Sequence, residues 1–131
     1  MIRKSPLSEK FLRKTSVSAT RNATHIQQIL KKTLPNYGSV LEIGSGTGQH
    51  SVVFADALPT LKWIPSDANS SNFDSINGWR QLAINNIPDA PRLIDASNSN
   101  WFLDVNDNIT ALVVINVIHI SPWSVTRGIL K

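Results

Sequence analysis

The chain has 131 residues, a formal net charge of +4, 41% hydrophobic residues, 17% charged residues and no cysteine. These values fit one folded domain and exclude an intrinsically disordered chain, a disulfide framework and a thiolate zinc site. No apolar run in the sequence approaches the roughly 18 residues that span a bilayer, so we expect a cytoplasmic protein without membrane contact and without a metal site.

Residues 1–15 form a basic segment ahead of the first predicted helix. Five of the 13 basic residues lie in the first 14 positions, against the single acidic residue Glu9. A flexible, solvated tail is the simplest interpretation. Basic segments also contact nucleic acid and occur in transit peptides, so nucleic-acid binding and mitochondrial targeting remain alternatives. The folded domain is predicted to occupy residues 16–131.

The first part of this domain predicts a helix, a strand and a second helix. Apolar residues recur at spacings of three and four from Ala19 to Leu34, which indicates an amphipathic helix that Pro35 ends. The short apolar segment Ser39–Ile43 runs into glycines and indicates a buried strand. Residues 48–58 carry apolar side chains on one side and stop at Pro59, as expected of a helix.

The rest of the chain repeats this alternation. Residues 61–65 predict a strand that ends near Pro65, because proline cannot donate to a sheet ladder. Next come a helix from residues 69–71 to 87–88, strands at 92–95 and 109–118, and a helix that opens at Ser121-Pro122-Trp123. Strands alternating with helices predict an α/β fold with a parallel sheet, helices on both faces and right-handed crossovers.

A glycine-rich loop joins the first predicted strand to the helix that follows it. Glu42 precedes Gly44, Gly46 and Gly48 in the pattern G-x-G-x-G. Glycines there allow a tight turn and let a ligand approach the backbone and the free amides of the helix start. Dinucleotide-binding folds use G-x-G-x-x-G, whose third glycine position is Gln49 here. The loop therefore disfavours a nicotinamide cofactor, and simple turn geometry is the alternative to any cofactor site.

Two aspartates follow the next two predicted strands. Asp67 stands at the carboxyl end of the second strand, where a carboxylate can accept both ribose hydroxyls of an adenosine. Asp95 stands at the end of the third strand, where such folds contact the adenine amino group. A helix-capping or turn role is the alternative for each aspartate.

Polar residues also mark the end of the fourth predicted strand. Asn116 interrupts an apolar run and needs hydrogen-bond partners if it is buried, which the methionine part of a cofactor or the neighbouring backbone could supply. His119 is the candidate general base, because the ordinary pKa of histidine lies near physiological pH. A structural role is the alternative for His119, as it is for His50, and core packing is favoured for Trp123.

Three segments together carry a resemblance to a known family. They are residues 41–50 (Leu-Glu-Ile-Gly-Ser-Gly-Thr-Gly-Gln-His), residues 63–67 (Trp-Ile-Pro-Ser-Asp) and residues 115–123, which include Ile-His-Ile-Ser-Pro-Trp. The chain resembles, from about residue 16 to its end, a methyltransferase-like family of unassigned substrate within the class I S-adenosylmethionine (SAM) dependent methyltransferases. Residues 19–22 also resemble that family's Ala-Glu-Arg-Asn stretch, with Thr20 in place of the acidic residue.

The resemblance implies a Rossmann-like fold, a cofactor and a reaction class. The residues that it would place around SAM are Arg21, Glu42, Gly44, Ser45, Gly46, Gly48, Asp67, Asp95 and Asn116. Arg21 would reach the carboxylate of SAM, with a salt bridge on the helix surface as the alternative. The implied reaction is methyl transfer to a small-molecule acceptor, with His119 as the base. A non-catalytic module that binds an adenosine cofactor or nucleic acid is the alternative function.

The resemblance also implies a longer sheet than this sequence supplies. A class I methyltransferase has seven strands in the order 3-2-1-4-5-7-6, and four strands are predicted here. The fourth predicted strand is apolar on both faces, as a central parallel strand should be, and without a neighbour its outer edge would expose unpaired backbone groups. We therefore expect a truncated chain that keeps much of a SAM site and has little catalytic activity.

Overall fold

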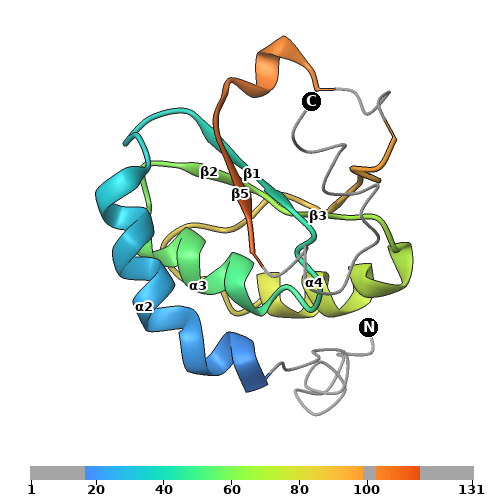
Figure 1. Ribbon diagram of the computed structural model, residues 1–131, viewed down its shortest axis with the longest axis horizontal. Coiled ribbons are helices and arrows are strands. Elements are labelled where there is room, and N and C mark those ends of the chain that lie inside the picture. Colours follow the sequence, from blue (N-terminus) through green and yellow to red (C-terminus); the bar gives the residue numbers. More distant parts are fainter. Residues whose placement is uncertain (1–16, 99–102, 116–131) are drawn as a thin grey trace, which may run out of the picture.

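The computed structural model describes residues 17–98 and 103–115, with side chains from residue 22 onward (Figure 1). The predicted tail at residues 1–15 and the predicted helix at Ser121 lie outside the described residues. The elements are α2 (Val17–Thr33), β1 (Ser39–Ile43), α3 (Gln49–Ala57), β2 (Lys62–Ile64), β3 (Ser66–Asp67), the short 3-10 helix η1 (Ser70–Asn72), α4 (Phe73–Arg80), β4 (Arg92–Leu93), the 3-10 helix η2 (Val105–Asp107) and β5 (Ile109–Val114).

All described strand pairs are parallel, as predicted for an α/β fold. β1 lies between β2 and β5, and β3 pairs with β4. β3 continues the path of β2 after Pro65, which has no N–H to donate but whose carbonyl oxygen accepts from the Arg92 N–H at 3.0 Å. The spatial order is therefore β4, then β2 with β3, then β1, then β5. This arrangement is consistent with a Rossmann-like fold.

Side chains alternate between the two faces of the central strands. Val40, Trp63 and Val113 point to one face and pack against α2 and α3 through Leu30 and Phe54. Figure 1 shows α2 and α3 together on that side, with α4 next to α3.

The opposite face of the sheet carries a second apolar cluster. Leu41, Ile43 and Ile64 pack there against Ile94 and Ala96, from the segment after β4. Within the described residues this cluster contains no helical residue. The prediction of helices on both faces therefore holds for one face in the described part of the chain.

The observed element bounds differ from the predicted ones mainly after α4. α2 and β1 were placed correctly, but α4 ends at Arg80 and not at residue 87, and β4 ends at Leu93 and not at Asp95. The chain leaves the helix because the Asp56 carboxylate accepts the backbone N–H groups of residues 84–86, at 2.9–3.3 Å. β5 is described to Val114, and residues 116–118 of the predicted strand lie outside the described residues.

No helix within the described ranges 17–98 and 103–115 is long and apolar enough to cross a membrane.

Candidate functional site

The glycine loop lies at the carboxyl end of β1 and leads directly into α3. Its three glycines all have positive φ, +68° at Gly44, +59° at Gly46 and +89° at Gly48. L side chains rarely adopt this left-handed conformation, so glycine spacing in the sequence reflects backbone geometry. Gly48 is the residue immediately before α3, and its left-handed conformation sets the direction in which the helix leaves the loop.

Gly46 and Gly48 have different surroundings. A Cβ added at Gly48 would lie 2.6 Å from the Cα of Ile76, because the start of α3 packs closely against α4. A Cβ added at Gly46 would meet no heavy atom of the described residues within 4 Å. Gly48 therefore serves close packing, whereas the backbone at Gly46 borders open space that a ligand can approach.

Asp67 binds this open part of the loop from the end of β3. Its Oδ2 accepts the backbone N–H of Gly46 at 2.8 Å, and its Oδ1 accepts the Asn69 N–H at 3.0 Å and the Asn72 side-chain amide at 3.2 Å. The Asp67 residue is 8% exposed. The structure thus joins two residues that the sequence analysis singled out, Gly46 and Asp67, through one hydrogen bond across adjacent strands.

Glu42 and Ser45 lie beneath the loop, inside the protein. Oε1 of Glu42, a residue only 2% exposed, accepts from Ser45 Oγ at 2.8 Å, Ser51 Oγ at 2.5 Å and Trp63 Nε1 at 3.1 Å. The Ser45 N–H also donates to the Ser66 carbonyl at 2.7 Å, and Ser45 Oγ accepts from the Ser66 N–H at 3.0 Å. These bonds connect the loop to β2, β3 and α3, so Glu42 and Ser45 shape the loop from below.

Asp95 follows β4 and has an exposed side chain. Its Oδ1 accepts the Ser97 hydroxyl at 2.6 Å and the Ser97 N–H at 3.0 Å. These two hydrogen bonds from Ser97 hold the pKa of the Asp95 carboxyl below its usual value. The neighbouring Ile94 N–H donates to the Asp67 carbonyl at 3.1 Å, which places Asp95 one residue from the Asp67 backbone. Asp95 thus has the turn geometry that the sequence left open as its alternative.

Of the remaining residues that the sequence analysis considered for the site, some lie within the described part of the chain and others lie outside it. His50 is buried and stacks on Phe54 with ring centroids 4.9 Å apart, so it belongs to the packing of α3. Arg21 lies in α2, and its side chain is outside the description. Asn116, His119 and Trp123 lie outside the described residues, and their predicted roles stay predictions.

Sequence reasoning did not single out Asn72 or Ser51. Asn72 contacts Asp67 from the end of η1, and Ser51 contacts Glu42 from α3. The run of Asn and Ser after Asp67 was interpreted only as the start of the helix predicted from residues 69–71. Ser51 is the second residue after Gln49 at the start of α3, and no periodicity in the sequence relates it to Glu42.

The described residues form an α/β domain with a glycine loop and a buried carboxylate at the carboxyl ends of adjacent parallel strands. Residues 13–131 match the family described as "Protein of unknown function (DUF938)". Since this match covers nearly the whole chain, the protein belongs to that family. The family description assigns no activity.

Proposed function

We propose that this protein is a class I SAM-dependent methyltransferase that acts on a small-molecule acceptor. The observation that carries the proposal is the hydrogen bond between Gly46 and Asp67 beside open space at Gly46. In open parallel α/β sheets, ligands bind beyond the carboxyl ends of the strands, near the glycine loop. The proposed cofactor site is that edge of the sheet.

The residues at this edge fit an adenosine cofactor. The lack of a side chain at Gly46 leaves its backbone accessible, and the Asp67 carboxylate can accept hydroxyl groups of a ribose. When bound, SAM would supply an activated methyl group. Glu42 and Ser45 would keep the loop in the conformation that receives the cofactor, and His119 stays the predicted base for the acceptor.

The start of α3 favours SAM over NAD. The third glycine of a dinucleotide motif allows close packing between helix and strand. Gln49 occupies that position as the first residue of α3, and it is only 9% exposed. A buried glutamine at this point supports a cofactor that does not need the dinucleotide geometry.

Calorimetric titration of the chain with S-adenosylhomocysteine and, separately, with NAD tests the proposal. We expect saturable binding of S-adenosylhomocysteine alone. Asp67→Ala should weaken this binding about tenfold or more, because hydrogen bonds to a charged group contribute roughly 1.5–3 kcal/mol. Asp74→Ala is the matched control, since it removes one exposed negative charge from the first turn of α4 without touching the loop.

A second variant keeps the test informative even if Asp67→Ala does not fold. Gly46→Ala places a methyl group in open space and should also abolish binding while circular dichroism shows a folded chain. Binding of NAD in preference to S-adenosylhomocysteine, or unchanged binding in both variants, would refute the proposal.

A further inference from the structure

Among the described residues, the Asp67 carboxylate already has three hydrogen-bond donors. They are the backbone N–H groups of Gly46 and Asn69 and the side-chain amide of Asn72. An ionised carboxylate offers about four lone-pair positions to donors. The three donors therefore leave roughly one position for a ligand.

A ribose carries two neighbouring hydroxyl groups, so its recognition by one carboxylate needs two acceptor positions. One of the three protein donors must therefore withdraw when the diol binds. The N–H groups of Gly46 and Asn69 belong to the main chain, on the glycine loop and in the turn after β3. The Asn72 amide alone among these donors is carried on a rotatable side chain, and its contact of 3.2 Å is the longest of the three.

We infer that Asn72 is a positioning residue that holds the Asp67 carboxylate until a ribose diol displaces the Asn72 amide. This inference rests on the proposed function. The Asn72 amide occupies one acceptor position of Asp67, a residue that is 8% exposed. Rotation of the Asn72 side chain releases that position and uncovers the carboxylate. Asn72 therefore acts as an intramolecular competitor of the second hydroxyl group.

The inference predicts an affinity change that depends on the ligand. Asn72→Ala removes the competitor and should tighten binding of S-adenosylhomocysteine by about three- to tenfold, the equivalent of one hydrogen bond. The 2′-deoxy analogue of S-adenosylhomocysteine needs one acceptor position only, so its affinity should stay within about twofold. The readout is the dissociation constant of the 2′-deoxy analogue divided by that of S-adenosylhomocysteine. A general structural defect would change both constants alike and leave this ratio unchanged.

The experiment is a calorimetric titration of the wild-type chain, Asn72→Ala and a control with each of the two ligands. Asn77→Ala is the matched control, since the Asn77 side chain accepts from Arg80 on the same helix at 2.8 Å. The control should leave the ratio of dissociation constants unchanged. A melting curve of each variant accompanies the titrations.

The outcomes separate this inference from the proposed function. A ratio that rises in Asn72→Ala and not in Asn77→Ala supports the inference. Wild-type binding of S-adenosylhomocysteine with the same ratio in Asn72→Ala, or weaker binding of both ligands by that variant, overturns the inference and leaves the proposed function standing. If neither the wild-type chain nor Asn72→Ala binds S-adenosylhomocysteine, the proposed function and the inference fall together.

Discussion

The glycines of the loop share positive φ angles but differ in what surrounds them. At Gly48 an added Cβ would lie 2.6 Å from the main chain of α4, which cannot yield as the end of a flexible side chain can. At Gly46 the same atom would meet nothing within 4 Å in the described part of the chain. The same substitution should therefore have two different effects on stability.

We predict that Gly48→Ala destabilises the fold much more than Gly46→Ala. The strained backbone costs each variant about 1–2 kcal/mol, and overpacking against Ile76 adds roughly 1–3 kcal/mol at Gly48 only. Urea unfolding followed by circular dichroism gives both free energies. Equal losses of stability in the two variants would contradict the close packing of α3 against α4.

At the residue scale the sequence predicted backbone requirements better than side-chain partners. Gly44, Gly46 and Gly48 were identified from their spacing because positive φ restricts the residue type. The resemblance placed Glu42 among the residues around SAM, and it did not predict that the Glu42 carboxylate accepts from donors on the loop, α3 and β2. Those donors come together only when the elements pack, so no local sequence pattern predicts them.

Between α3 and β2, a polar side chain from another part of the chain completes the turn. The Asn86 amide donates to the carbonyl oxygens of Ala55 at 3.0 Å, Leu58 at 3.2 Å and Leu61 at 2.6 Å. The last carbonyls of a helix have no partner within the helix. Asn86 supplies one from a segment 25–31 residues further along the chain.

We predict that Asn86→Ala lowers the free energy of unfolding by about 2 kcal/mol, because it leaves partly buried carbonyl groups without this donor. Asn85→Ala should change it by no more than about 0.5 kcal/mol, since Asn85 is exposed and its backbone N–H keeps its bond to Asp56. Chemical denaturation of both variants gives the comparison. An Asn86→Ala variant as stable as Asn85→Ala would show that the amide does not hold the end of α3.

The contacts of the Asp56 carboxylate explain why the end of α4 was mispredicted. Apolar residues at 73, 76, 83 and 84 suggested a helix to residue 87, and periodicity alone cannot detect a competing carboxylate. Asp56 binds three successive N–H groups that a longer helix would need for itself. The bounds of β1 and β2 were predicted well, because the apolar residues of each strand and the Gly and Pro residues beside it are adjacent in the sequence.

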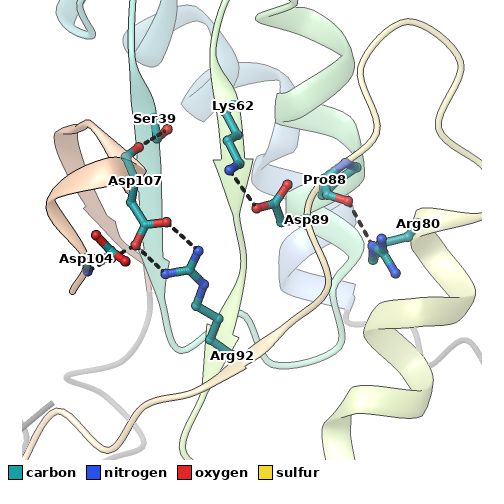
Figure 2. Close-up of polar contacts among 8 residues, drawn as sticks. All are labelled: Ser39, Lys62, Arg80, Pro88, Asp89, Arg92, Asp104 and Asp107. Atoms are coloured by element: carbon teal, nitrogen blue, oxygen red, sulfur yellow. Dashed lines mark hydrogen bonds and ion pairs between the residues drawn. The ribbon is translucent and has the colours of Figure 1, made fainter. Parts of the chain in front are cut away.

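Across the whole molecule, one ion pair connects the outer strand β4 to the segment that precedes β5. Arg92 and Asp107 form two hydrogen bonds, Nη1 to Oδ2 at 2.7 Å and Nη2 to Oδ1 at 2.8 Å, beside the start of β1 (Figure 2). The Ser39 hydroxyl donates to the Asp107 carbonyl at 2.6 Å. The pair therefore joins segments that lie on either side of β1 and β2.

Because of this ion pair, the stability of the whole domain should decrease at acidic pH. The hydrogen bonds from Arg92 lower the pKa of Asp107 from 3.8 to about 2 in the folded chain. Because the folded pKa is the lower one, the stabilisation is complete above about pH 4 and is lost as the pH falls through 2. Asp107→Asn should lower the melting temperature by about 5 °C at pH 7, and this difference should shrink between pH 4 and pH 2.

The pair of Lys62 and Asp89 provides the matched control for that measurement. It is more exposed, with 50% of the Lys62 side chain and 33% of the Asp89 side chain accessible, and its Nζ to Oδ2 distance is 3.3 Å (Figure 2). Exposed ion pairs contribute little because water screens them, so Asp89→Asn should change the melting temperature by no more than about 2 °C at any of these pH values. If Asp107→Asn and Asp89→Asn gave the same melting temperatures from pH 7 to pH 2, the parallel sheet would not depend on the bidentate contact between β4 and the start of β5.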